Sequence, residues 1–331
     1  MSIRPVKRLI KSKPTLEGAG VRLRRAFGFG DTGDYDPFLL LDDFRGDRTE
    51  DYVAGFPWHP HRGIETITYV LAGTVDHGDS LGNRGAIGAG DVQWMTAGRG
   101  IVHQEMPHGD EIGRMHGFQL WANLPSSLKM TAPRYQDIRA GDIPEVTDDD
   151  GTRVRVVCGY FRGVRGPVDG VAAEPQYLDV WVPAGRRRSL KVDTSRNAFA
   201  YVFEGVGRFA DASEPQAVRT DVIGQPEGAA AGQGTTAAPG GSSSPRTGDV
   251  AAPASDVRPV DADNRSLILF GSGDEITVQA GEHGVRFLFV SGTPIREPVA
   301  WRGPIVMNTR EELQRAFEEY QNGTFLDPRP R

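Results

Sequence analysis

The chain has 331 residues with abundant glycine (42) and proline (23), a length and composition typical of two ordinary domains rich in turns and short strands. Charged residues make up 25% of the chain and its formal net charge is −6, which favours a soluble globular protein and argues against direct nucleic-acid binding. With one cysteine, no secretory signal and no stretch that approaches a membrane span, the sequence predicts a cytoplasmic protein without internal disulfides.

The first 25 residues are strongly basic, in contrast to the chain as a whole. Glu17 is accompanied there by eight basic residues: Arg4, Lys7, Arg8, Lys11, Lys13, Arg22, Arg24 and Arg25. A basic arm of this kind is able to contact a nucleic acid or an acidic lipid. We expect the simpler structure, which is a solvated strand with exposed basic side chains.

From residue 65 onward, short apolar runs alternate with turn signals. Residues 67–71 are β-branched and aromatic, and glycine-containing turns follow them at short spacing. The second half repeats the pattern, with strands expected at residues 153–160, 177–182, 198–203, 266–270, 275–278 and 285–290. Regular turns between short strands are typical of a sandwich or a barrel, so the sequence predicts an all-β fold.

The two halves also resemble each other. Residues 69–73 are echoed by residues 201–205, and residues 88–91 are echoed by residues 271–274. Matches that keep their order and their strand context indicate an internal duplication. We therefore expect two tandem copies of one barrel.

The duplication predicts an N-terminal domain at residues 1–140 and a C-terminal domain at residues 141–331. Within the second domain, residues at about 211–262 are rich in glycine, alanine, serine and proline. Such a tract cannot bury enough apolar surface to offset the entropy of ordering it. We expect a disordered insert within the second barrel, because strand patterns continue beyond it.

The chain closes with one predicted helix. Thr309 stands three residues before Glu312, which is the arrangement of a capping box. An apolar stripe at helical spacing follows, formed by Leu313, Ala316, Phe317 and Tyr320. We expect this stripe to pack on a barrel.

Six of the seven histidines lie in the first half, and three of them have the spacing of metal ligands. His59 and His61 are two residues apart and would share one face of a strand, while Pro60 between them favours a strand at a sheet edge. His103 and Glu105 repeat this geometry with an imidazole and a carboxylate. Two such strands meeting inside a barrel would surround one point with three nitrogens and one oxygen, a set that suits Fe, Mn, Ni, Cu or Zn.

The oxygen ligand has two candidates. Glu65 follows His61 by four residues and, like Glu105, has the parity of an inward-facing side chain. The residues alone leave both candidates open.

Two elements combine glycine with these histidines. The first consists of Gly55, His59-Pro60-His61, Glu65 and Gly73, and the second of Gly90, Gly98-Arg99-Gly100 and His103. They resemble the cupin superfamily and, specifically, the pirin family. The pirin pattern is most similar at residues 36–44, 56–63, 100–105 and 119–121, and the resemblance becomes looser over the second half.

The resemblance implies two tandem cupin barrels, each a double-stranded β-helix or jelly roll, followed by a short C-terminal helix. It implies iron (Fe2+ or Fe3+) in the first barrel, although other divalent first-row metals fit the same donors. The implied ligands are His59, His61, His103 and Glu105, with Glu65 outside the ligand set.

The resemblance implies no metal in the second barrel. The repeat aligns Lys191 and Asp193 with the paired histidines of the first barrel. It aligns Arg286 and Leu288 with the histidine and the glutamate of the later element. These residue types do not form a metal site together.

Pirins are associated with quercetin 2,3-dioxygenase activity, and mammalian members are also described as transcriptional coregulators. The resemblance therefore implies a flavonol 2,3-dioxygenase that acts on a flavonol-like aromatic small molecule, and we expect the protein to be a monomer. Its Glu105 would take the proton of the 3-hydroxyl group as general base. The alternative is a metal- or redox-dependent regulatory protein that docks on a transcription or metabolic partner without turnover. A third hypothesis is a cupin whose metal only stabilises the fold.

Overall fold

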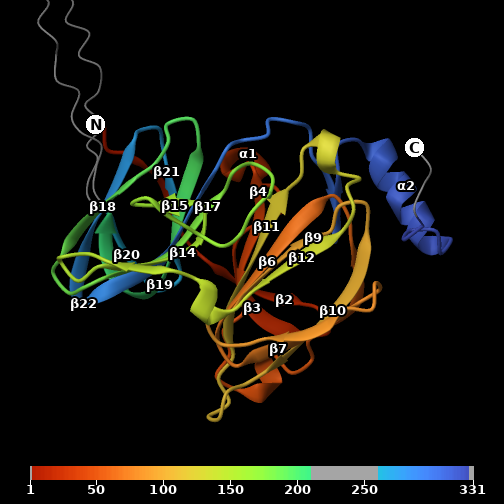
Figure 1. The fold of residues 1–331 in the computed structure, drawn as a ribbon, viewed down its shortest axis with the longest axis horizontal. Helices are drawn as coiled ribbons and strands as arrows, with labels where there is room; N and C mark the ends of the chain where they lie inside the picture. The colour runs from red at the N-terminus through yellow and green to blue at the C-terminus, as the bar shows by residue number, and fades with distance from the viewer. Residues whose placement is uncertain (1, 210–259, 328–331) are drawn as a thin grey trace, which may run out of the picture.

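The computed structural model describes residues 2–209 and 260–327, and in this part of the chain two β-barrels lie side by side (Figure 1). The first half of the chain forms one barrel and most of the second half forms the other, while a helix closes the chain beside the first barrel. The expected all-β fold of two tandem barrels with a short C-terminal helix is confirmed. Most of the insert expected at about 211–262 lies outside the described residues, which begin again at residue 260. The last residues of the expected insert belong to a strand at 260–263.

The first barrel is built from two facing antiparallel sheets. The larger sheet has seven strands, in the order β12 (Arg134–Ile138), β9 (Val92–Thr96), β6 (Ile64–Ala72), β11 (His116–Asn123), β4 (Phe38–Asp43), β3 (Val21–Phe27) and β2 (Lys13–Glu17). The smaller sheet has four strands, in the order β5 (Phe56–His61), β10 (Ile101–His108), β7 (Thr74–Asp79) and β8 (Arg84–Ile87). Val70 on the larger sheet and Val75 and Ile87 on the smaller one share an apolar core.

The second barrel is built around a nine-stranded antiparallel sheet. Its main path runs β1 (Val6–Lys11), β21 (Ser266–Phe270), β19 (Asn197–Phe209), β22 (Glu275–Gly292), β17 (Gln176–Val182), β14 (Arg153–Cys158) and β13 (Glu145–Thr147). Two further strands join this sheet, β18 (Arg187–Lys191) on β22 and β20 (Val260–Asp263) on β19. The short elements are α1 (Thr32–Tyr35), β15 (Tyr160–Phe161), β16 (Val164–Arg165) and the 3-10 turns Thr49–Asp51, Ser126–Leu128 and Ala140–Asp142.

The segments expected as separate strands at residues 275–278 and 285–290 are the two ends of one bent strand, β22. Its first part pairs with β18 and its last part with β17, while β19 pairs along both. Gly284, with a φ of 80°, allows the backbone to bend between the two parts. Pairing with β19 therefore continues across the residues between the two parts, where the sequence predicts that the strand is interrupted.

The two barrels pack through their large sheets, and the duplicated tyrosines meet there. The Tyr69 hydroxyl of the first barrel donates to Asp179 of the second at 2.8 Å. The Tyr201 hydroxyl of the second barrel donates to Asp43 of the first at 2.9 Å. This reciprocal pair of contacts supports the duplication, because the two equivalent tyrosines make equivalent bonds across the interface.

The two ends of the chain cross between the barrels. β1 pairs with β21 and so belongs to the second sheet. The hairpin of β23 (Ala300–Arg302) and β24 (Ile305–Met307) and the helix α2 (Arg310–Gln321) lie against the first barrel, where Ile305 bridges Arg62. The domain boundary at residue 140 stays a prediction, and the contacts of both chain ends cross it.

The predicted capping box of α2 is present. The Thr309 hydroxyl accepts a hydrogen bond from the backbone N–H of Glu312 at 3.1 Å, and the Glu312 carboxylate accepts one from the N–H of Thr309 at 3.0 Å. Ala316 is buried against the hairpin, and Leu313 and Phe317 pack beside it. In the described residues, no helix is long and apolar enough to cross a membrane.

A buried ion pair ties α2 to the first barrel, and its removal is expected to destabilise the protein. Arg62 donates to the Glu319 carboxylate at 2.7 Å and to the Phe325 carbonyl at 2.8 Å. Glu319→Ala would leave the buried guanidinium without this carboxylate, at an expected cost of about 3 kcal/mol in the free energy of unfolding. Urea unfolding measures the change, with the exposed neighbour Glu318→Ala as control. Equal stability of the two variants would contradict a structural role for this pair.

Candidate metal centre

The three candidate histidine ligands lie on two paired strands of the smaller sheet. β5 carries His59 and His61, and β10 carries His103, which is the register partner of His59. β5 is the edge strand of its sheet, as Pro60 predicts, because proline cannot donate to a further strand. The strand geometry thus brings the three imidazoles to one place.

The imidazoles are close enough to hold one ion. One nitrogen from each of His59, His61 and His103 lies within 4.8 Å of the others. The ring centroids are 4.4 Å apart for His59 and His103, 4.8 Å for His59 and His61, and 5.0 Å for His61 and His103. Among the described residues, no other group of three or more histidine, cysteine or acidic side chains has this geometry.

The hydrogen bonds of the rings fit a cation at the centre. The Nδ1 atoms of His59 and His61 lie 2.9 Å and 3.1 Å from the carbonyl oxygens of Pro57 and Pro304, so each Nδ1 carries the proton that it donates. In the neutral rings the two Nε2 atoms then bear lone pairs, yet they lie 3.1 Å apart. Two lone pairs at this distance repel each other unless a cation lies between them. Carbonyl contacts at the remote nitrogen are also the usual way in which ligating histidines are oriented.

The surroundings favour the neutral form of His61 and His103, as ligation requires. Burial, and then the neighbouring His59 and His103, hold the pKa of His61 well below its usual value. Burial is also the main cause of the lowered pKa of His103. Both ring nitrogens of His103 are buried without a hydrogen-bond partner among the described residues, which leaves a lone pair free for an ion.

Glu105 lies on the same strand as His103, but the structure does not bring its carboxylate into the histidine cluster. Its Oε1 accepts a hydrogen bond from the Thr68 hydroxyl at 3.1 Å. The Gln119 side-chain amide lies 3.4 Å from Oε1 and 3.3 Å from Oε2. The carboxylate is therefore buried beside the histidines and held by two neutral donors, and its role as an oxygen ligand stays a prediction.

Glu65 faces the second barrel, so its expected inward parity is wrong. Its carboxylate accepts a hydrogen bond from the Thr96 hydroxyl at 2.8 Å. It also lies near Cys158 of the second barrel, where its charge adds to burial in raising the pKa of the thiol. The reason is the turn at Gly63, which separates β5 from β6. Counting alternate residues from His61 fails across this turn, because the strand is not continuous there.

Burial of Glu65 predicts a pH-dependent stabilisation by Glu65→Gln. Burial raises the pKa of this carboxyl from 4.5 to about 6, although the Thr96 hydrogen bond opposes the shift. The folded state therefore holds the proton more tightly than the unfolded state, and stability falls as the pH rises from 4.5 to about 6. We expect Glu65→Gln to raise the free energy of unfolding by about 2 kcal/mol at pH 7 and by little at pH 4.

Urea unfolding at both pH values tests this expectation. Exposed Glu111→Gln is the matched control and should change stability little at either pH. A gain for Glu65→Gln that is the same at pH 4 and pH 7 would show that the carboxylate charge is not its cause.

A cavity of about 570 Å³ opens beside the histidines, with His59 and His61 in its wall. Four aromatic side chains also line it, namely Phe29, Phe56, Trp121 and Trp301. The Trp121 ring lies 5.0 Å from the ring of His61 and 6.0 Å from that of Trp301, and Phe29 lies 5.5 Å from Trp301. A flat aromatic molecule fits such walls, because ring stacking and apolar burial both stabilise it.

The same cavity is also lined by charged side chains. Arg25 donates to both carboxylate oxygens of Asp42, at 2.9 Å and 2.8 Å, and pairs with Glu17 at 2.8 Å. Burial raises the pKa of Asp42 to about 6 in spite of the opposing effect of Arg25. The cavity thus offers hydrogen-bond donors and acceptors in addition to the candidate metal ligands.

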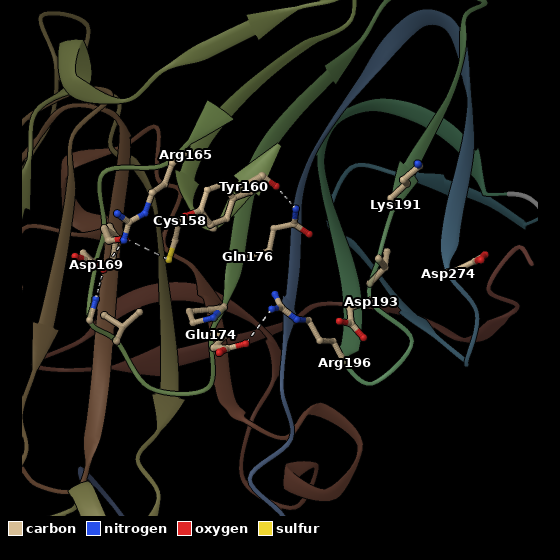
Figure 2. A pocket seen from close by; sticks show the side chains of 16 residues that line it. Cys158, Tyr160, Arg165, Asp169, Glu174, Gln176, Lys191, Asp193, Arg196 and Asp274 are labelled. Carbon is tan, nitrogen blue, oxygen red and sulfur yellow. Dashed lines mark hydrogen bonds and ion pairs between the residues drawn. The ribbon is translucent and has the colours of Figure 1, made fainter. Parts of the chain in front are cut away.

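A larger cavity of about 750 Å³ lies on the second barrel (Figure 2). Two of its arginines are paired with acidic side chains of the same cavity, Arg196 with Glu174 and Arg165 with Asp169. Cys158 lies at this cavity, and burial raises the pKa of its thiol to about 12, so the thiolate that metals and electrophiles require is disfavoured. We therefore place the candidate site at the histidines.

The strand register corrects the alignment of the two repeats. β18 and the first part of β22 pair in the second barrel as β5 and β10 do in the first. Their inward side chains are apolar and belong to the core of the second barrel: Leu190, Val192, Ile276 and Val278. Lys191 and Asp193 are exposed, because a shift by one residue turns a side chain to the other face of its strand.

The counterparts proposed for His103 and Glu105 are also wrong. Leu288 pairs with Tyr201 as Phe118 pairs with Tyr69, so this part of β22 corresponds to β11 and not to β10. Arg286 lies at the barrel interface, where it donates to Asp179. The inward positions of the second barrel offer apolar side chains in place of metal ligands.

Sequence analysis missed several residues of the site. Thr68 and Gln119 hold the Glu105 carboxylate, and Trp301 and Pro304 reach the site from the C-terminal hairpin. For Gln119 a signal existed, since it lies in the pirin-like run at residues 119–121. The hairpin is too distant in the sequence for any local pattern to place it there.

Comparisons with known proteins agree with this architecture. The sequence matches the family model described as Pirin at residues 20–122 and the model described as Pirin C-terminal cupin domain at residues 247–326. A pirin-like protein of Caulobacter vibrioides is 41% identical over 326 residues, which cover 98% of this chain and 100% of the relative. A Pseudomonas aeruginosa protein, provisionally named a quercetin 2,3-dioxygenase, is 37% identical over 324 residues, 97% of each chain. The crystal structure of quercetin 2,3-dioxygenase from Acinetobacter baumannii is 28% identical, covers 98% of this chain and 99% of that chain, and superposes with a TM-score of 0.76.

Proposed function

The chain belongs to the pirin family, and from that premise we propose that it is an iron-dependent dioxygenase that cleaves flavonols such as quercetin. The observation that carries the proposal is the position of the three-histidine cluster. Two of its members, His59 and His61, stand in the wall of an aromatic cavity of about 570 Å³. A relative and a structural neighbour named for quercetin 2,3-dioxygenase support the same reaction class.

The metal would be held by His59, His61 and His103, with Glu105 as the predicted fourth ligand. Iron is the proposed ion, and other divalent first-row ions suit the same donors. When bound, it would supply Lewis-acid and redox chemistry toward a substrate hydroxyl and dioxygen. The carbonyls of Pro57 and Pro304 keep the ligating nitrogens of His59 and His61 aimed at the ion.

The cavity would bind the flavonol as a flat ring system. The rings of Trp121, Trp301 and Phe29 offer stacking faces and exclude water from the substrate. The Arg25–Asp42 pair lies at the same cavity and is able to bond the hydroxyl groups of the substrate. These contacts orient the 3-hydroxyl group toward the histidines.

Glu105 is the proposed general base. A carboxylate beside the bound hydroxyl is suited to accept its proton. Thr68 and Gln119 fix the orientation of the carboxylate by donating to it. The proton then resides on a Glu105 oxygen until product release.

The cavity favours an enzyme over the regulatory alternative. A regulator that senses the oxidation state of its metal needs no cavity at the ligands, whereas turnover requires one that admits an organic substrate. The aromatic lining at His59 and His61 therefore supports catalysis. A purely structural metal is likewise expected to be sealed from such a cavity.

Aerobic turnover of quercetin by the iron-loaded, full-length protein tests the proposal. We expect loss of quercetin absorbance with consumption of one dioxygen and release of one carbon monoxide per flavonol, and we expect chelation to stop it. Binding of quercetin to the metal-free protein, followed by tryptophan fluorescence, reports on the cavity separately. An iron-loaded protein that leaves quercetin unchanged, or turnover that survives chelation, would overturn the proposal.

A further inference from the structure

A third cavity is lined by an unusual number of arginines. It measures about 610 Å³ and lies between β2, β3 and the segment after β4 in the first barrel and the β20–β21 turn of the second. One carboxylate, that of Asp51, is among its lining residues. We call it the arginine cleft, after the side chains Arg22, Arg24, Arg45, Arg48 and Arg265. It shares no lining residue with the cavity at the histidines.

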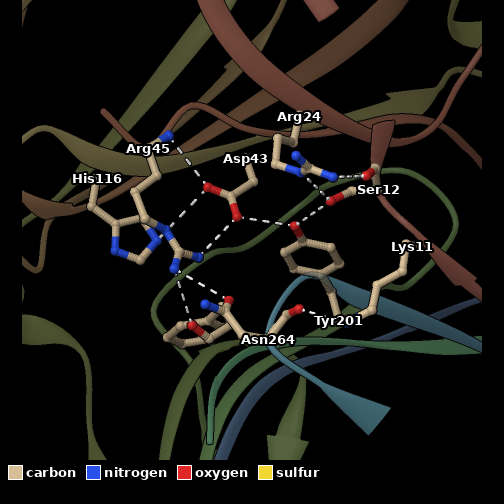
Figure 3. A network of polar contacts seen from close by, with 9 residues as sticks. Lys11, Ser12, Arg24, Asp43, Arg45, His116, Tyr201 and Asn264 are labelled. Atoms are coloured by element: carbon tan, nitrogen blue, oxygen red, sulfur yellow. Dashed lines mark hydrogen bonds and ion pairs between the residues drawn. The ribbon is translucent and has the colours of Figure 1, made fainter. Parts of the chain in front are cut away.

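One of the lining arginines, Arg45, is held by contacts with both barrels (Figure 3). Arg45 donates to Asp43 of the first barrel at 2.9 Å, and to the Phe203 carbonyl and the Asn264 side chain of the second at 3.3 Å and 3.2 Å. Tyr201 holds the same Asp43 carboxylate from the other side. The Arg45 guanidinium is therefore already in place before any ligand arrives, which lowers the entropy cost of binding.

The other arginines differ in how many of their N–H donors are already bonded to protein groups. Arg24 is held by the hydroxyl and the carbonyl of Ser12 (Figure 3). Arg22 and Arg48 are exposed and both contact the Asp51 carboxylate, at 3.5 Å and 3.1 Å, and Arg48 also pairs with Glu50 at 3.3 Å. Each guanidinium carries five N–H groups, so both arginines retain donors for a ligand.

The arginines produce a local positive field in a chain whose net charge is −6. The effect of this field is seen in the pKa of the neighbouring His116. Burial, and then the charges of Arg45, Arg286 and Arg265, lower the pKa of His116 to about 2, so this histidine adds no charge of its own. The Nε atoms of Arg45 and Arg265 are buried and have no hydrogen-bond partner among the described residues.

We propose that the arginine cleft binds a small ligand that carries two or more phosphate groups. Guanidinium groups bond phosphate oxygens through paired N–H donors, and several guanidiniums around one cleft suit a multiply charged anion. The volume is that of a site for a small organic ligand. Because Arg265 belongs to the second barrel and the other four arginines to the first, the ligand would bridge the two barrels.

Isothermal titration of the full-length protein with pyrophosphate at pH 7.5 and low salt tests the proposal. We expect saturable binding, and we expect Arg22→Gln/Arg48→Gln to weaken it by at least about tenfold. Both side chains are exposed, so the variant should fold as the parent does. The matched control is Arg186→Gln/Arg187→Gln, which removes the same charge from two exposed arginines on the second barrel.

Each outcome decides the matter. Retained affinity in the control variant together with a loss in the cleft variant supports the site. Equal losses in both variants would mean that pyrophosphate responds only to overall charge, and absence of saturable binding by the parent would overturn the proposal outright. Citrate binding as tightly as pyrophosphate would overturn the assignment to phosphate. The proposal does not depend on the dioxygenase activity, because none of these readouts involves turnover.

Discussion

Replacement of His103 by alanine is expected to remove the bound metal and to lower flavonol turnover by at least about 100-fold. His103 is buried at the centre of the cluster, with its ring 4.4 Å from that of His59 and 5.0 Å from that of His61. Its loss would leave two imidazoles on an edge strand and the predicted Glu105 ligand, without the buried ring that joins the two strands of the site, so the ion would be held much less firmly. Metal content by elemental analysis and quercetin turnover under air measure the two effects separately.

His108→Ala is the matched control for this variant. His108 lies on the same strand, β10, but is exposed and contacts Asp76 at 3.1 Å. It should retain both metal and turnover. If His103→Ala kept the metal content and the rate of the parent, the histidine cluster would not be the catalytic centre.

Glu105→Gln is expected to lower kcat by about 100-fold or more, because an amide cannot accept the substrate proton. The replacement keeps the size of the side chain, so Thr68 can still donate to its oxygen. A loss confined to kcat at unchanged iron content, with KM for quercetin little changed, would identify proton transfer. A pH profile of kcat/KM adds a second readout, since the acidic limb that reports an ionising base should disappear in the variant.

Glu65→Gln tests which of the two candidate carboxylates, Glu65 or Glu105, is the oxygen ligand of the metal. Glu65 lies on the face toward the second barrel, with Thr96 as its donor, so its replacement should leave turnover and metal content as in the parent. Loss of metal in Glu65→Gln and not in Glu105→Gln would reverse the assignment of the oxygen ligand.

Much of the fold follows from local patterns in the sequence. Turn signals at short spacing predict the strands, and the Thr309–Glu312 pair predicts the start of α2, because both depend on residues that are neighbours in the chain. The pairing of β1 with β21 is not predictable in this way. It joins residues more than 250 positions apart, and the basic residues of β1 resemble those of any solvated strand.

The candidate site likewise combines features that follow from local sequence with features that depend on distant parts of the chain. His59 and His61 share a face because one strand carries both, and His103 meets them through strand pairing. Predicting the face of a side chain by counting alternate residues failed wherever a turn or a bulge interrupts the strand. This happened at Gly63 before Glu65 and in the alignment of the two repeats. Trp301 could not be predicted, since the hairpin that carries it docks from the far end of the chain.

X-ray absorption spectroscopy of the iron-loaded, full-length protein tests the central claim most directly, because it reports the atoms around the ion. The account predicts one iron per chain with scattering from three imidazole rings and light-atom ligands only. An iron surrounded by one imidazole or none would contradict a metal centre built from His59, His61 and His103.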